Sequence, residues 1–426
     1  MATLLFFCHS SVANTFKTEQ WVTHNGARVI FYQAMEVPML DISLAFAAGS
    51  AYDGKSYGLS ALTTQLLNDG SAGVNASTIA ETLADTGAQF DVTTNKDMAI
   101  LSLRTITQKA VLNKAMALFS QIISQPNFSQ DAVDHEKKQL LMAIEQRNNT
   151  PNELATTLFF QSLYGNHPYA HPATGSKESL NAIKQKQITQ FYQRYFVGNN
   201  AVLVFVGAID SLTAHQLAEQ LTQALPKGEQ APPLMKAEPL SKAQHHHQDF
   251  PSTQTIIRLG QLGIDHHNPH YFPLVMGNYI LGGSGLVSRL AVELREKRGL
   301  TYSVDSQLIP MPGPGPFFIS LATKKGQTQE AIQLAENILQ NFIAHGPSEQ
   351  ELLAAKRYLT GSFPLSLSSN KAIASLLLRM TFYRLPDDFL STYITRINQV
   401  TAEDIRLAFQ QEINPHALQW LTVGPS

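Results

Sequence analysis

The feature that most constrains the fold of this chain is an internal repeat. A strand, a helix and a second helix that begins with polar residues follow one another in the first half, and the same order returns in the second half. These elements are expected at residues 98–104, 109–123 and 131–145, and again at 316–322, 330–343 and from 349 onward. Aligning Leu101 with Ile319, 218 positions later, keeps the neighbouring elements in step. A repeat this long indicates a duplicated domain, because solenoid repeats have periods of roughly 20 to 50 residues.

The repeat predicts two similar α+β domains. Each half opens with a strand pattern, at 41–46 and at 253–259, and a helical pattern follows. Strands and helices come in groups, which favours a mainly antiparallel sheet with helices packed on one face. We therefore expect a bilobed clamshell with a groove between the lobes. The expected boundaries are an N-terminal domain at 14–225, a proline-rich linker at 226–248 and a C-terminal domain at 249–426.

Composition excludes several classes of function. The 31 basic and 33 acidic residues leave a net charge of −2, so a nucleic-acid partner is not expected. No apolar run reaches the 18 or so residues that span a bilayer, so we expect no membrane span. The single cysteine, Cys8, lies near the start of the chain. A disulfide scaffold, a zinc ribbon and a thiol nucleophile in the body of the protein are excluded.

Residues 1–13 resemble a short secretory signal. An apolar run at 2–8 precedes small residues at Ser11 and Ala13, although the positively charged start of such signals is missing. This string predicts cleavage before Asn14 and a soluble protein in the periplasm or cell envelope. The alternative is a frayed end with no targeting role.

The sharpest local string lies in the second half. It runs from Leu281 through two glycines to Gly285 and continues, with Glu-Leu-Arg-Glu-Lys-Arg-Gly-Leu-Thr-Tyr at 293–302, to Val304. This string resembles the second-domain signature of the insulinase- and pitrilysin-type zinc peptidases, which carry an inverted H-x-x-E-H motif. Other strings resemble the family in the same order, at 49–70, 136–151, 167–175 and 265–283. The resemblance covers nearly the whole chain after about residue 20.

The family's zinc positions are degenerate in this sequence. In the family, a helix reading roughly G-L-x-H-x-x-E-H supplies two histidine ligands and a glutamate that activates water. Ala61 and Gln65 stand at the two histidine positions, and Thr64 stands at the glutamate position. The third ligand, a glutamate seven residues after the one that opens a charged helix, corresponds to Ala143. Since catalytic zinc needs three protein ligands, we expect no metal and no cofactor in this chain, and no catalytic residue of its own.

Two family positions in the second domain are retained. The resemblance implies that Arg295 and Tyr302 match an arginine and a tyrosine, seven residues apart, that reach the substrate across the cavity. A guanidinium and a phenol are donors that can hold a peptide carbonyl and stabilise oxyanion charge. The alternative is that Arg295 belongs to a solvated charged helix face and that Tyr302 is partly in the core.

Taken together, the resemblance implies a non-catalytic subunit of a heteromeric zinc peptidase. A partner of the same family, in a heterodimer or larger assembly, would hold the zinc, and this chain would close the chamber around an unfolded peptide. The alternative is a purely structural scaffold or assembly protein of the same fold. An autonomous peptidase with a displaced metal site is disfavoured, because the sequence contains no other H-x-x-E-H cluster.

Overall fold

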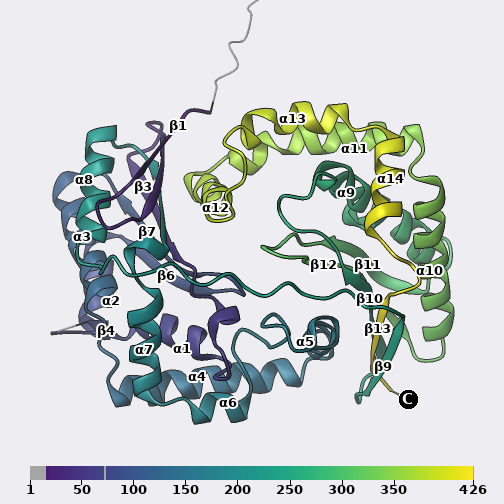
Figure 1. The fold of residues 1–426 in the computed structure, drawn as a ribbon, viewed down its shortest axis with the longest axis horizontal. Helices are drawn as coiled ribbons and strands as arrows, with labels where there is room; N and C mark the ends of the chain where they lie inside the picture. Colours follow the sequence, from purple (N-terminus) through teal and green to yellow (C-terminus); the bar gives the residue numbers. More distant parts are fainter. Residues whose placement is uncertain (1–15, 72, 426) are drawn as a thin grey trace, which may run out of the picture.

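The computed structural model describes residues 16–71 and 73–425. The expected signal segment, 1–13, and Cys8 within it lie outside these residues. The structure confirms two similar α+β lobes, which Figure 1 shows side by side with the linker crossing between them. Among the described residues, no helix combines the length and apolar character needed to cross a bilayer.

The first lobe is built on a six-stranded sheet. Its strand order is β1-β2-β8-β3-β7-β6, and all neighbours are antiparallel except β2 and β8. The strands are β1 (Thr18–Val22), β2 (Arg28–Gln33), β3 (Met39–Phe46), β6 (Gln89–Thr94), β7 (Ala99–Ile106) and β8 (Ala201–Gly207), with a separate hairpin of β4 (Gly70–Ser71) and β5 (Val74–Asn75). The helices are α1 (Leu59–Gln65), α2 (Ala76–Thr86), α3 (Lys109–Ser124), α4 (Gln130–Asn148), α5 (Pro151–Tyr164), α6 (Lys177–Ala182), α7 (Gln185–Tyr195) and α8 (Ser211–Thr222).

The second lobe is built on a five-stranded sheet. Its order is β11-β12-β10-β13-β9, and only β13 and β9 run parallel. The strands are β9 (Gln244–Asp249), β10 (Gln254–Leu262), β11 (Thr301–Leu308), β12 (Pro316–Lys324) and β13 (Gln419–Gly424). The helices are α9 (Tyr271–Asn278), α10 (Thr328–His345), α11 (Glu349–Ser362), α12 (Asn370–Phe382), α13 (Phe389–Gln399) and α14 (Ala402–Glu412). Two short π-helical segments, η4 (Tyr279–Gly283) and η6 (Ala291–Glu296), lie between α9 and β11.

The repeat predicted from sequence extends through most of the fold. The pairs β7 and β12, α3 and α10, α4 and α11, α5 and α12, α7 and α14, and β8 and β13 each start 217 to 219 residues apart. The parallel pair at one side of each sheet, β2 with β8 and β9 with β13, is repeated as well. The duplication therefore preserves both the order of the elements and the sheet topology.

The two lobes exchange one helix each. Helix α5 of the first half packs on the second sheet, where the Phe159 and Phe318 rings have centroids 5.3 Å apart. Helix α12 of the second half packs on the first sheet, where Leu377 joins the cluster that contains Val202 and Val204. The sequence predicted helices on one face of each sheet, and the structure adds this exchanged helix on the other face.

The exchange explains why β8 is apolar along its whole length. Residues 201–207 are all buried, and alternate side chains point to opposite faces of the sheet. Leu203 and Phe205 pack against the lobe's own helices, whereas Val202 and Val204 pack against α12. A strand covered on both faces has no place for the polar residues of a half-exposed strand.

The linker is shorter than expected at its C-terminal end. Residues 226–243 contain no helix or strand, and β9 begins at Gln244, within the segment predicted to be linker up to residue 248. In β9, the His245 ring stacks on Trp420 with centroids 5.3 Å apart, and His247 Nδ1 lies 2.8 Å from Thr422 Oγ1. These histidines therefore belong to an edge strand of the second sheet.

Candidate functional site

Helix α1 carries the residues predicted to match the family's metal helix, and it has a well-defined start. Its first turn is held by Asp53, whose two carboxylate oxygens accept hydrogen bonds of 2.7 Å from the backbone N–H groups of Gly58 and Ser60. Gly58 has φ 94°, and a Cβ there would lie 2.7 Å from the Thr174 carbonyl oxygen. A glycine is required at this position both for the left-handed backbone and for the close approach.

The three degenerate positions on α1 offer little to a metal ion. Ala61 is buried and has no donor atom, and Gln65 is half-buried with only a neutral amide. The Thr64 hydroxyl is fully buried and donates a 2.8 Å hydrogen bond to the Ser60 carbonyl, within its own helix. A hydroxyl engaged in this way cannot take a proton from water as a carboxylate does.

The fourth degenerate position, Ala143, lies on α4, which packs against α1. Its side chain is exposed and also has no donor atom. Within the part of the chain that the structure describes, no group of three or more His, Cys, Asp or Glu side chains is placed to hold a metal ion. The donor set at the family's zinc positions does not fit zinc, which requires three nitrogen, sulfur or carboxylate ligands.

The retained pair, Arg295 and Tyr302, lies in the other lobe. Arg295 is near the end of η6, and Tyr302 is the second residue of β11, the outermost strand of its sheet. Between them Gly299, at φ 62°, turns the chain from the helix into the strand. Both side chains are exposed, Tyr302 to 75%. Among the described residues, neither side chain has a hydrogen-bond or ion-pair partner, so Arg295 is not held in the charged cluster that joins Glu293 to Lys297 and Arg298.

An irregularity in β11 exposes Tyr302. The pairing of β11 with β12 shifts register between Thr301 and Val304, so the residues between them leave the regular ladder. The Thr301 hydroxyl fixes this bulge by donating to the Ala322 carbonyl at 2.7 Å. Bulges of this kind redirect a side chain out of a strand and are common beside functional sites.

The π-helical turns in front of β11 depend on a glycine. A Cβ on Gly282 would lie 2.4 Å from the backbone nitrogen of Ser306 in β11, so η4 packs directly on the strand. The structure places Gly282 and Gly283, the two glycines of the family-like string, in η4. π-Helical segments occur often at functional sites.

The structure also shows a buried polar network that the sequence analysis missed. It lies around the hairpin between β6 and β7, where Lys96 donates to the His171 carbonyl oxygen. Asp97 accepts a 2.5 Å hydrogen bond from the Tyr169 hydroxyl and a 2.9 Å hydrogen bond from the Tyr383 hydroxyl. Tyr383 follows α12, so the Asp97 carboxylate connects the two halves of the chain. The partners lie 72 and 286 positions away, and no local pattern pointed to them.

Burial dominates the electrostatics of this network. It raises the pKa of Asp53 to about 8, against the opposing effect of the two backbone N–H groups and of Lys96. It lowers the pKa of Lys96 to about 8, although Asp53 and Asp97 favour the charged amine. The pKa of His171 is lowered to about 4, again mainly by burial. Its hydrogen bonds reach the start of α1 through Asp53 and join the two halves of the chain through Asp97.

Comparison with protein families gives two matches in chain order. Residues 28–177 match the model described as insulinase (peptidase family M16), and residues 182–359 match the model described as the peptidase M16 inactive domain. The first match covers α1 and α4, and the second covers Arg295 and Tyr302.

Individual relatives agree with the family models. The chain is 27% identical over 413 residues to a Helicobacter pylori protein described as the non-peptidase homolog YmxG, covering 95% of this chain and 93% of that protein. A crystal structure described as a peptidase M16 inactive domain from Pseudomonas fluorescens is 36% identical, covers 96% of this chain with 98% of its own length, and superimposes with a TM-score of 0.93. The crystal structure of a Helicobacter pylori protease has the same fold, with a TM-score of 0.90 at 18% identity, covering 96% of this chain and 100% of that one.

Proposed function

This chain belongs to the insulinase family of peptidases (M16) as an inactive homologue, and from that membership we propose that it is the non-catalytic subunit of a two-chain zinc peptidase. The observation that carries the proposal is a contrast between the two lobes. The lobe that corresponds to the metal domain keeps its anchored helix α1 but has lost its donors, and the other lobe keeps two exposed donors, Arg295 and Tyr302.

The partner in this proposal is a second chain of the same family with an intact H-x-x-E-H helix. That partner would hold the zinc ion and supply the glutamate that activates water. This chain would close the chamber and contribute no ligand, since Ala61 and Ala143 have no donor atoms.

Arg295 and Tyr302 would act on the peptide substrate. A guanidinium and a phenol that have no hydrogen-bond partner among the described residues can both donate to a peptide carbonyl. Held in place on η6 and β11, they would orient the scissile segment and stabilise negative charge on its carbonyl oxygen. The expected substrate is an unfolded peptide, because an extended chain can pair with an exposed strand edge such as that of β11.

The test is reconstitution with the native partner, obtained by affinity purification of this chain from its source. The chain alone should carry no stoichiometric zinc and cleave no peptide, and the mixture should cleave. Arg295→Gln and Tyr302→Phe should each raise the activation free energy by about 1–3 kcal/mol, which lowers kcat/KM of the mixture by roughly 5-fold to 150-fold.

Matched controls are Arg357→Gln and Tyr358→Phe, which change an exposed arginine and an exposed tyrosine on α11. They should leave cleavage unchanged. Full activity of both Arg295→Gln and Tyr302→Phe in a zinc-dependent complex would reduce the role of this subunit to that of a scaffold. Tight zinc and turnover in the isolated chain would refute both the subunit and the scaffold.

The location proposed for this complex is the periplasm or cell envelope, on the basis of the leader-like string at 1–13. Cell fractionation with N-terminal sequencing of the purified chain tests this. A mature chain that starts at Asn14 in the envelope fraction supports export, and a chain with residues 1–13 in the cytosolic fraction contradicts it.

A further inference from the structure

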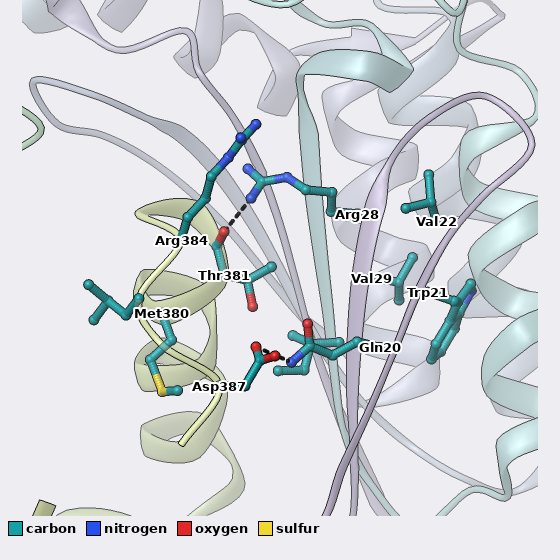
Figure 2. Close-up of a pocket in the computed structure, with 11 residues that line it drawn as sticks. Gln20, Trp21, Val22, Arg28, Val29, Met380, Thr381, Arg384 and Asp387 are labelled. Atoms are coloured by element: carbon teal, nitrogen blue, oxygen red, sulfur yellow. Dashed lines mark hydrogen bonds between the residues drawn. The ribbon is translucent and has the colours of Figure 1, made fainter. Parts of the chain in front are cut away.

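A pocket of about 580 Å³ lies at the junction of the two lobes, away from α1 and from the Arg295–Tyr302 pair. Strands β1 and β2 form one wall, and the end of α12 with the residues that follow it forms the other (Figure 2). Its volume lies within the range of pockets that bind small ligands, roughly 300–1,000 Å³. Because the walls come from different halves of the chain, a ligand here would contact both the first sheet and the helix that the second half packs on it.

The strand register decides which side chains face the pocket. Val22 pairs with Arg28, and Gln20 pairs with Ile30, which packs in the same cluster as α12. Paired residues share a face of the sheet, and alternate residues do as well, so these four side chains lie on the face toward α12.

Two arginines occupy one end of the pocket. Arg28 comes from β2, and its Nη1 donates to the Thr381 carbonyl at the end of α12 at 2.5 Å. Arg384 comes from the other wall, and Figure 2 shows the two guanidinium groups beside each other. Within the described residues, the Arg384 side chain has no hydrogen-bond or ion-pair partner. Burial first, and the charge of Arg384 second, lower the pKa of Arg28 to about 10.

The backbone of Arg384 is held in an unusual conformation. Its φ is 54°, and it is the single non-glycine residue with positive φ among those that the structure describes. It stands where helix α12 ends, and the next backbone N–H, of Leu385, donates to the Met380 carbonyl at 2.9 Å. Glycine is the usual residue at this point of a helix, because other residues pay a steric cost there. This backbone conformation places the Arg384 guanidinium beside that of Arg28, although both carry a positive charge.

The carboxylate in the pocket wall does not neutralise this pair. Asp387 accepts a 3.2 Å hydrogen bond from the Gln20 side chain at the opposite end of the pocket in Figure 2. The free protein therefore holds two adjacent cations beside a partly apolar wall that includes Val22, Ile30, Met380 and Leu385.

We propose that this pocket binds a carboxylate attached to an apolar group, as at the C-terminus of a peptide. Arg28 and Arg384 would hold the carboxylate through charge-assisted hydrogen bonds, and the apolar wall would receive the terminal side chain. An inorganic phosphate is also an anion that the two arginines could hold, but it leaves that wall in contact with water. The site uses none of the residues of the proposed function and does not rest on it.

Occupation of the pocket should also stabilise the junction between the lobes. A ligand that binds only the assembled walls raises the free energy of unfolding, by an amount that grows with the ligand concentration relative to Kd. Binding and stabilisation are therefore two independent readouts of one event.

The experiment is calorimetric titration of the full chain with N-acetyl-Ala-Ala-Leu as the free acid, as the C-terminal amide, and with inorganic phosphate. The free acid should bind at least ten-fold more tightly than either of the others and should raise the Tm. Equal binding of acid and amide, tighter binding of phosphate than of the acid, or no binding of the acid would each overturn the proposal.

Arg384→Gln removes one cation without removing a side-chain hydrogen bond to the described residues, so this variant should fold and lose at least ten-fold in affinity for the acid. Arg384→Gly should relieve the backbone strain, raise the stability of the free chain and lose the same affinity. Arg357→Gln on α11 is the control and should bind as the unmodified chain does. Retained affinity in both folded Arg384 variants would refute the assignment. Arg295→Gln should leave this binding unchanged, which separates it from the proposed peptidase role.

Discussion

The Tyr383 hydroxyl donates a 2.9 Å hydrogen bond to the Asp97 carboxylate, across the boundary between the two halves of the chain. Asp97 sits in the hairpin between β6 and β7 of the first lobe, and Tyr383 follows α12, the helix that the second half contributes to the first sheet. Burial raises the pKa of Asp97, and the hydroxyls of Tyr169 and Tyr383 oppose that rise by bonding to the carboxylate. The hydrogen bond between Asp97 and Tyr383 therefore forms only when α12 is packed on the first sheet.

Replacing Tyr383 with phenylalanine should destabilise the protein by about 1–3 kcal/mol, the cost of leaving a buried acceptor without a donor. Urea unfolding followed by circular dichroism measures this. Tyr358→Phe is the matched control, because the exposed Tyr358 stacks on Tyr279 and its hydroxyl makes no hydrogen bond to the described residues. Equal stability of the two variants would show that the Asp97 contact adds nothing to the junction.

Gly282→Ala should destabilise the second lobe by about 1–3 kcal/mol, as overpacking does, because the new Cβ would lie 2.4 Å from the Ser306 nitrogen. Gly361→Ala should change the stability in the opposite direction. Gly361 lies in α11 with no neighbour near its Cβ position, so alanine there should stabilise by about 0.4–1 kcal/mol. Thermal unfolding of both variants tests the pair, and a Gly282→Ala protein as stable as the unmodified chain would contradict the close packing of η4 on β11.

The raised pKa of Asp53 predicts that the stability of the protein depends on pH. Its pKa is raised to about 8 in the folded protein, so between about pH 4 and pH 8 the folded state binds more protons at this site than the unfolded state. The free energy of unfolding of the unmodified chain, relative to Asp53→Asn, should therefore fall as pH rises through this window, by up to about 1.4 kcal/mol per pH unit.

Lys96 should change the stability in the opposite direction and at higher pH. Because its pKa is lowered to about 8 in the folded protein, the free energy of unfolding should rise as the pH increases above about 8. Asp210→Asn is the control for the Asp53 measurement. The pKa of Asp210 is lowered, so this residue changes the pH dependence of stability only below about pH 4.

If the free energy of unfolding of Asp53→Asn and of the unmodified chain changed with pH in parallel, the raised pKa of Asp53 would be contradicted.

Restoring three ligands should restore metal binding. In the variant Ala61→His, Gln65→His and Ala143→Glu, two imidazoles four residues apart share one face of α1, and a carboxylate is placed on α4, the helix that packs against α1. After dialysis, elemental analysis should find close to one zinc ion per chain. The double variant without Ala143→Glu should retain much less. A folded triple variant that binds no zinc would mean that α1 and α4 are no longer spaced for a metal site.

Much of the fold was predictable because it is encoded locally. Strand and helix patterns recur at an offset of 218 residues, and each pattern depends on neighbours only a few positions away. The loss of the zinc donors was predictable for a related reason. Whether a side chain carries a donor atom is a property of the residue itself, so Ala61 and Ala143 exclude a ligand in any structure.

The polar network and the pocket could not be predicted, because they are made by contacts between distant parts of the chain. Asp97 and Tyr383 are 286 positions apart, and Arg28 bonds to a carbonyl 353 positions away. Nothing in the sequence around Asp97, Tyr383 or Arg28 distinguishes these residues from surface residues. Similarly, the histidines at 245–247 were expected in the linker, and only the neighbouring β13 made them part of a strand.

The amino-acid sequence by itself determined that this chain is a duplicated α+β protein of the insulinase type, with Ala61 and Ala143 at two positions predicted for zinc ligands, because periodicity, motif and donor atoms are local properties. Only the tertiary structure decided that α5 and α12 cross to the opposite lobes, and that Arg28 and Arg384 meet between them. The physical reason is that a helix with an apolar face packs wherever the most apolar surface can be buried, and that surface is formed only when distant strands have assembled into a sheet.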